Sequence, residues 1–175
     1  MVEDAPVGEK VIWRGGPSQA LNYNTFTICV LLVGVVALLP EIWDLFLANS
    51  KYAQYKDYYF LLSKAAFFVP FAWGTWSYLK IHCHRYELTT ERLLEHNGVF
   101  SRTSDELELY RVKDITFVQP FSLRMFKCGN IILDTSDRST PVVVLQAIEN
   151  GRPVMNALRK YVDVMRTKKG VREID

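Results

Sequence analysis

The sequence predicts a membrane protein of the α+β class, in which a two-helix transmembrane hairpin precedes an antiparallel β-roll with a C-terminal amphipathic helix. Two apolar stretches, at residues 25–47 and 58–80, are each long enough to cross a hydrocarbon core of about 30 Å. After Arg85 the sequence becomes polar and charged, with the short periods typical of strands. We therefore expect a cytoplasmic lead-in at 1–24, the hairpin at 25–80, a cytoplasmic domain at 81–167 and a flexible tail at 168–175.

The distribution of basic residues around the two stretches predicts their orientation. Lys and Arg concentrate before the first stretch and after the second, whereas the segment between them contains Lys51 and Lys56. Because loops rich in Lys and Arg stay on the cytoplasmic side, both termini are expected in the cytoplasm. The chain is then a multi-pass protein of the inner membrane.

Three charged residues fall within the apolar stretches, at Glu41, Asp44 and Lys64. Measured by helical rise from the cytoplasmic side, Glu41 and Lys64 reach a similar depth, which allows an interhelical ion pair. Alternatively, Lys64 extends its side chain to the outer interface and the first helix ends early at Pro40. We favour the second interpretation. An ion pathway is not expected, because it would repeat polar residues along one helix face.

Beyond the hairpin, alternating and β-branched residues between turn signals predict short strands. Asn97 and Gly98 form the turn of one hairpin, because these residue types tolerate positive φ. The segment 120–127 interrupts the alternation and is expected to be a short helix or an irregular turn. The expected strands are 82–89, 92–97, 99–109, 114–119, 130–135 and 141–145.

The last expected element is a helix that Asn150 caps and that has Pro153 in its first turn. Its apolar residues recur at helical spacing and so form one face for packing against the strands. These residues are Val154, Leu158, Tyr161, Val162 and Met165.

Five motifs give this pattern a family resemblance: YELTTERL from Tyr86, GVFSR from Gly98, ELYRVKDI from Glu108, LRMF from Leu123 and CGNI from Cys128. Together with the lead-in GEKVIWRGGPS, this series resembles the bacterial membrane-flanked pleckstrin-homology-like (PH-like) domain family. The resemblance implies a PH-like roll, in which a helix closes one end of a bent sheet, beside a transmembrane helix pair. Lys127 departs from the family pattern, which usually has glycine in that turn. The family has no agreed activity to transfer to this chain.

Metal and catalytic motifs are weak in this sequence. His82 and His84 would share one face of a strand while Cys83 points to the other, and further ligands are missing from the pattern. Phosphate-binding loops, nucleophile elbows and helical HExxH motifs do not occur in it. We therefore expect no metal, no cofactor and no enzymatic activity. Three cysteines in three different settings fit free thiols in a reducing cytoplasm.

Basic residues near the second apolar stretch and in expected loops are candidates for contact with an anionic membrane surface or a partner. From Arg85 onward the chain has 15 Lys and Arg and 13 Asp and Glu, so this part is nearly neutral. A mixed solvated surface is therefore an equal alternative. A nucleic-acid partner is not expected. The candidate residues are Lys80, Arg85, Arg111, Lys113, Arg124 and Lys127.

The leading functional hypothesis is a non-catalytic, membrane-anchored binding module that serves as a scaffold or adaptor for a partner protein or its own copies. Its expected partners are the phospholipid membrane and a second copy or another membrane protein. One alternative is a sensor of anionic phospholipid headgroups that acts through the basic loops. Another is an accessory subunit of a transport or export complex, assembled through Glu41, Asp44 and Lys64.

Overall fold

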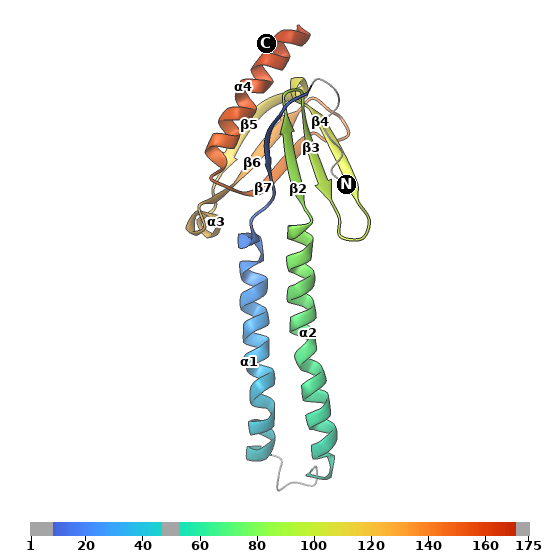
Figure 1. Ribbon diagram of the computed structural model, residues 1–175. Helices are drawn as coiled ribbons and strands as arrows, with labels where there is room; N and C mark the ends of the chain where they lie inside the picture. The colour runs from blue at the N-terminus through green and yellow to red at the C-terminus, as the bar shows by residue number, and fades with distance from the viewer. Residues whose placement is uncertain (1–8, 47–52, 171–175) are drawn as a thin grey trace. The chain divides into compact units, whose positions relative to one another are not determined.

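The structure is a computed structural model that describes residues 9–46 and 53–170 (Figure 1). The chain divides into two compact units. One is a helical unit, Asn22–Leu79, and the other is a folded domain made from the described residues up to Leu21 together with those from Lys80 onward. The domain is therefore assembled from both sides of the helical unit.

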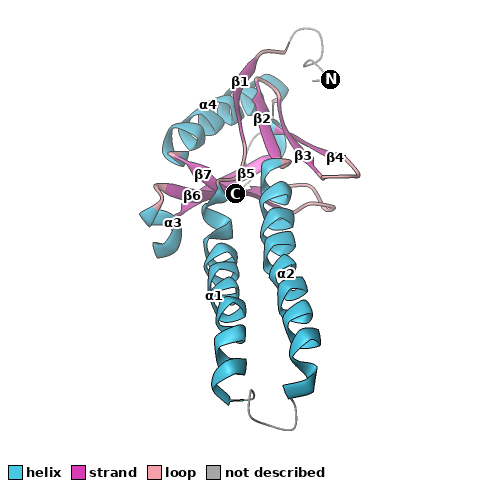
Figure 2. Cartoon of the chain, turned by 60° about the horizontal axis from the view of Figure 1, so that its bottom comes forward, coloured by secondary structure: helices cyan, strands magenta, loops and turns pink. Residues whose placement is uncertain are grey.

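The helical unit consists of α1 (Tyr23–Phe46) and α2 (Lys56–His82), with the short 3-10 turns η1 (Gln19–Asn22) and η2 (Ala53–Tyr55) before them. The two long helices run side by side in both views (Figures 1 and 2). Both helices were predicted, and their ends differ from the predicted bounds by one or two residues.

The expected early end of the first helix at Pro40 is wrong, because α1 continues to Phe46. Proline removes one helical hydrogen bond, but contacts on either side of it hold the helix together. Trp43 is buried and stacks on Tyr59 with ring centroids 4.4 Å apart. The Tyr59 hydroxyl also donates to the carbonyl of Leu39 at 3.1 Å.

Small and polar side chains line the contact between the two helices. A Cβ on Gly74 would lie 3.6 Å from Cys29 Sγ, so the helices pack closely there. Nearer the domain, Ser77 Oγ donates to Asn22 Oδ1 at 2.8 Å, and Asn22 Nδ2 donates to the Ser77 carbonyl at 3.0 Å. Large apolar side chains cover the outside of both helices instead, among them Val30, Leu31, Val35, Leu45, Leu61, Leu62, Phe68 and Phe71.

The charged residues of this unit do not pair within it as far as the structure describes them. Glu41 and Lys64 are both exposed, and among the described side chains no ion pair joins them. Asp44 lies in α1, and its side chain is outside the described part. Whether Lys64 extends to an interface stays a prediction.

One described helix is long and apolar enough, by length and composition, to cross a membrane. Its span is Gln19–Trp43, near the N-terminus. Although α2 is also long, it does not meet this criterion, since Lys64 and its Tyr and Trp residues lower the mean hydropathy. The criterion therefore does not support the predicted multi-pass topology.

The domain has two antiparallel sheets within its described residues. The first has the strand order β1-β2-β3-β4, and the second has the order β5-β6-β7. The sequence predicted all of these strands except the first. They are β1 (Val11–Gly15), β2 (Arg85–Thr89), β3 (Arg92–Asn97), β4 (Thr103–Glu108), β5 (Val112–Val118), β6 (Cys128–Thr135) and β7 (Val142–Glu149).

The segment expected as a lead-in contributes strand β1, which pairs with β2 from Val11 opposite Thr89 to Gly15 opposite Tyr86. Arg14 reinforces this pairing, because its guanidinium forms two 3.0 Å hydrogen bonds with the buried carboxylate of Glu87. The helical unit is thus inserted between two neighbouring strands of one sheet. A local pattern of residues cannot reveal a pairing across this distance in the chain.

The core lies between the two sheets and α4 (Gly151–Lys169), which packs against β5, β6 and the short turn η3 (Leu109–Arg111). The predicted apolar face of this helix is confirmed. Val154, Leu158, Val162 and Met165 are buried, and Tyr161 packs at the edge of the core. Fully burying one such side chain contributes about 1.5 to 3 kcal/mol.

Asn150 stands at the predicted N-cap of α4, but its side chain forms no capping hydrogen bond there. Its φ of 47° is left-handed, and its backbone N–H donates to the Lys127 carbonyl at 3.1 Å. Asn150 therefore ends the turn after β7 rather than capping the helix with its side chain. Pro153 lies in the first turn of α4, as expected.

Two connections differ from expectation. His82 is the last residue of α2, so the first predicted strand starts later, at Arg85. The β3–β4 connection extends from Gly98 to Arg102 instead of closing over two residues. Gly98 has a φ of 120°, and a Cβ there would lie 1.7 Å from the Ser101 carbonyl oxygen, so this turn requires glycine.

Candidate functional site

The predicted basic residues do not form one patch. Arg124 and Lys127 are neighbours, because both belong to the connection between β5 and β6, and both are exposed. Arg111 and Lys113 lie at the other end of β5 from that connection. Lys80 is exposed on the last turns of α2, and Arg85 is exposed at the start of β2.

Arg111 is held by acidic side chains. Its Nε lies 2.9 Å from Glu108 Oε2, and its Nη1 lies 2.9 Å from Asp137 Oδ2. Hydrogen bonds from the Ser139 backbone and hydroxyl, together with Arg111, keep the pKa of Asp137 below its usual range. Because two carboxylates neutralise its charge, Arg111 is a weak candidate for binding an anionic headgroup.

The β5–β6 connection contains the short helix α3 (Phe121–Met125), which matches the interruption expected at 120–127. Leu123 points inward and packs with Cys128 and Ala147 against Ala20 and Leu21. Three apolar side chains of the connection point outward instead. They are Phe121, which is 81% exposed, Met125, which is 68% exposed, and Phe126.

Hydrogen bonds fix the shape of this connection. Gln119 Nε2 donates to the Cys128 carbonyl at 2.9 Å, and Lys127 N donates to the Arg124 carbonyl at 3.0 Å. Lys127 adopts a φ of 56°, which is a conformation that favours glycine. This conformation accounts for the glycine that the family resemblance led us to expect in that turn.

A second exposed apolar group lies at the β3–β4 connection, residues 98–102. Phe100 is 89% exposed there, and Arg102 follows it on the surface. Figure 1 shows this connection and α3 at the same end of the domain. Neither aromatic group was among the predicted site residues. The available signal was a phenylalanine two or three positions before an arginine, as in Phe100 and Arg102 or Phe121 and Arg124, although Phe100 fell inside the strand expected at 99–109.

Chain connectivity shows that the hairpin joins the domain at this end. Arg85, three residues after the end of α2, pairs with His96, and β3 then leads directly into the 98–102 connection. Leu21 precedes α1 by two residues and packs beside Leu123 of α3. The two exposed connections therefore flank the points where the chain enters and leaves the helical unit.

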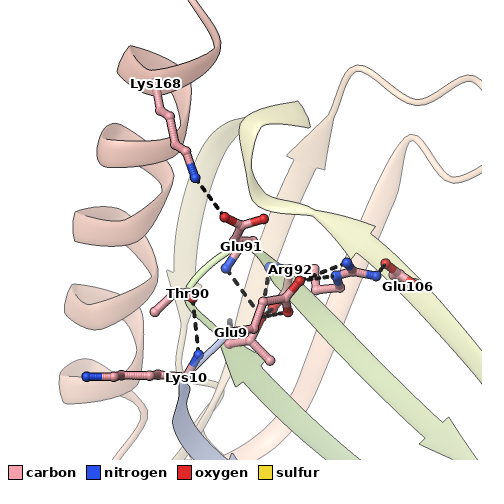
Figure 3. Close-up of polar contacts among 8 residues, drawn as sticks. Glu9, Lys10, Thr90, Glu91, Arg92, Glu106 and Lys168 are labelled. Carbon is pink, nitrogen blue, oxygen red and sulfur yellow. Dashed lines mark hydrogen bonds and ion pairs between the residues drawn. The ribbon is translucent and has the colours of Figure 1, made fainter. Parts of the chain in front are cut away.

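The opposite end of the domain carries a polar cluster that braces the fold (Figure 3). Glu9 accepts a hydrogen bond from the Thr89 hydroxyl at 3.1 Å and pairs with Arg92 at 2.7 Å, while Arg92 also pairs with Glu106. Lys168 of α4 bonds Glu91 at 2.8 Å and lowers the pKa of that carboxyl. These contacts tie β1, the β2–β3 turn, β4 and α4 together.

The His82-Cys83-His84 segment does not place its histidines on one strand. His84 lies beside Tyr86, and its Nε2 is 2.8 Å from Glu95 Oε1. Within the part of the chain that the structure describes, no group of three or more His, Cys, Asp or Glu residues is placed to hold a metal ion. The described cysteines are free thiols, as predicted: Cys29, Cys83 and Cys128.

Comparison with known proteins identifies the family. No curated protein matches the chain significantly. Among solved structures, the N-terminal PH domain of Vps36 matches with 20% identity and a TM-score of 0.40, over 51% of this chain and 68% of that chain. The profile described as "Bacterial PH domain" matches residues 25–162, which include nearly all of α1, all of α2 and strands β2 to β7. Because this match spans most of its length, the chain belongs to the bacterial PH domain family.

Proposed function

We propose that this protein is a membrane-anchored, non-catalytic binding module, in which α1 and α2 hold the PH domain on the cytoplasmic side of the bacterial inner membrane. The observation that carries the proposal is the apolar exterior of both helices. Leaving a Leu, Val or Phe side chain in water forfeits about 1.5 to 3 kcal/mol each relative to burial. A surface made of many such side chains requires an apolar environment around it.

The pairing of β1 with β2 requires both ends of the hairpin to lie on the same side of the membrane. β1 precedes α1, β2 follows α2, and these strands are hydrogen-bonded neighbours in one sheet. A chain that crosses the membrane through α1 must therefore cross back before Arg85. Among the described residues, α2 is the helix available for this return. The pairing of β1 with β2 therefore favours two crossings, although α2 is less apolar than α1.

Association with a second copy or another membrane protein follows from the charges on the hairpin. Glu41 lies about 27 Å along α1 from Tyr23, and Lys64 lies about 27 Å along α2 from His82, by helical rise. Both side chains are exposed at this common depth. Two hairpins related by a two-fold axis can pair Glu41 of one with Lys64 of the other, which satisfies both charges.

The first test is extraction from bacterial membranes. If the hairpin is inserted in the bilayer, the full chain stays in the membrane pellet after an alkaline carbonate wash and is released by detergent. Release by the wash alone would contradict the anchoring claim.

The second test is mass measurement in nanodiscs. We expect at least two copies per disc, or a co-purifying membrane protein. Single charge swaps, Glu41→Lys or Lys64→Glu, should reduce self-association, and combining them should restore it. A single 20.2 kDa protomer at every concentration, without a co-purifying protein, would contradict the assembly claim.

A second candidate function, recognition of anionic phospholipid headgroups, is favoured by one observation. Arg124 and Lys127 are exposed beside the apolar side chains of α3.

A further inference from the structure

Seven exposed side chains form what we call the junction surface, because they occupy the two connections that flank the ends of the hairpin. The surface combines four apolar side chains with three basic ones. Its members are Phe100 and Arg102 between β3 and β4, and Phe121, Arg124, Met125, Phe126 and Lys127 between β5 and β6.

The apolar members of this surface belong to neither hydrophobic core cluster of the described domain. In the α3 segment, Leu123 supplies the inward contact with Leu21 and Ala147, while Phe121 and Met125 point away from it. The connection is also held by hydrogen bonds from Gln119 and Asn150. Its outward aromatic face is therefore already formed in the folded domain, and docking it loses little conformational entropy.

The position and composition of the junction surface indicate that it contacts a lipid bilayer. Leu21 is two residues from the start of α1, so a hairpin embedded in a membrane keeps α3 within a few residues' reach of the headgroups. Aromatic rings prefer that interfacial layer, and basic side chains beside them face its anionic phosphates. Glu149 is a carboxylate at this end of the domain, and it accepts a hydrogen bond from the Ser18 hydroxyl.

We propose that the junction surface inserts Phe121, Met125, Phe126 and Phe100 into the interfacial layer of an anionic bilayer, with Arg102, Arg124 and Lys127 on the phosphates. The domain is then fixed against the membrane rather than swinging freely on its helices. This inference rests on the proposed anchoring, since the hairpin holds the surface near the bilayer. Each basic residue at the surface favours the docked over the undocked state by about fivefold.

The test uses the full chain with ¹³C-methyl methionine in nanodiscs that contain phosphatidylglycerol. Met125 reports on the junction surface, and Met165, which is buried in the core, is the internal control. The Met125 signal is assigned by its loss in Met125→Leu. Headgroup-proximal nitroxide lipid should broaden Met125 several-fold more than Met165, whereas a water-soluble gadolinium chelate should leave Met125 protected.

Charge variants test the basic part of the surface. Arg124→Gln combined with Lys127→Gln should reduce lipid-induced broadening of Met125, as should discs made of phosphatidylcholine alone. Lys113→Gln combined with Arg138→Gln removes the same charge from exposed positions at the far end of β5 and the β6–β7 turn, and should leave the broadening unchanged. Equal effects of the two double variants would overturn the assignment of the basic residues.

The other outcomes separate the two proposals. If the chain elutes with the disc but the gadolinium chelate broadens Met125 and the nitroxide lipid does not, the surface faces water and this inference fails alone. Protection of Met125 from both reagents would mean that a protein covers it, which also overturns the inference. Failure of the chain to elute with the disc would overturn the proposed anchoring and this inference together.

Discussion

The helical unit and the PH domain place the same kinds of side chain in opposite positions. Leu31 in α1 is 63% exposed, whereas Leu158 in α4 is fully buried. Each unit has polar contacts, but in the domain these lie around an apolar core, and in the hairpin they lie between the helices. The domain therefore supplies its own hydrophobic burial, whereas under the proposed function the hairpin obtains it from lipid or from another protein.

Truncating one leucine in each unit should show the contrast between the exposed and buried leucines most clearly. Leu158→Ala leaves a cavity in the core and should destabilise the domain by about 2 to 5 kcal/mol. Leu31→Ala should change the domain by less than about 0.5 kcal/mol, because Leu31 touches no part of its core. Urea titration of the full chain in detergent, followed by pulse proteolysis, measures both, and similar losses would contradict the two-unit description.

Glycine substitution tests the backbone of the two units. Gly98→Ala should cost about 2 to 3 kcal/mol, because φ is 120° and the new Cβ would collide with the Ser101 carbonyl. Gly34→Ala is the matched control, since a Cβ there meets nothing within 4 Å. In the α1 helix it should be neutral or favourable by up to about 1 kcal/mol. The same proteolysis assay, with circular dichroism for helix content, compares them; a tolerated Gly98→Ala would refute the turn geometry.

Tyr86 links the two sheets, and its ionisation provides a test inside the domain. Its hydroxyl is 3.3 Å from the Gln146 backbone nitrogen and 3.5 Å from the Val144 carbonyl, and burial raises its pKa to about 12. The unfolded chain loses this proton near pH 10, whereas the folded chain keeps it, so stability falls as pH rises from about 10 to 12.

Tyr86→Phe should remove that pH-dependent component and cost about 1 kcal/mol at neutral pH through the lost hydrogen bonds. Ultraviolet titration of the tyrosines, read as the difference between the two proteins, measures the pKa directly. A Tyr86 that titrates near pH 10 in the folded chain would contradict the buried bridge between the sheets.

The smallest expected effect concerns Lys127. A non-glycine residue in the left-handed conformation is strained by about 1 kcal/mol, so Lys127→Gly should stabilise the domain by up to that amount. Lys127→Ala removes the charge but keeps the strain, and should leave stability nearly unchanged. Thermal unfolding of the full chain separates the two variants. A loss of stability with glycine would show that the lysine side chain has a structural role.

Local patterns predicted much of this fold. The stripe from Val154 to Met165 identified α4, and β3 was predicted with the bounds that it has. Strand β1 was not predicted, although Val11, Ile12 and Trp13 are good strand formers, because its partner is β2, on the other side of the hairpin. Long-range pairing of this kind depends on tertiary structure rather than on periodicity.

The candidate site was less predictable than the fold. Charge alone selected Arg111 together with Arg124, yet Glu108 and Asp137 neutralise the first of these. The exposure of Phe121 and Phe100 depends on which residues of each connection fill the core, and Leu123 fills it next to Phe121. A sequence read without its fold cannot distinguish an outward phenylalanine from an inward one.

The most direct test of the central claim is the topology of the hairpin in living bacteria. A reporter that is active only outside the cytoplasm is inserted at Gln54, between the two helices, or fused after Asp175. If both helices cross the inner membrane and return the chain to β2, the Gln54 insertion is active and the Asp175 fusion is silent. Silence at both positions, or the reverse pattern, would contradict the membrane-anchored cytoplasmic PH domain.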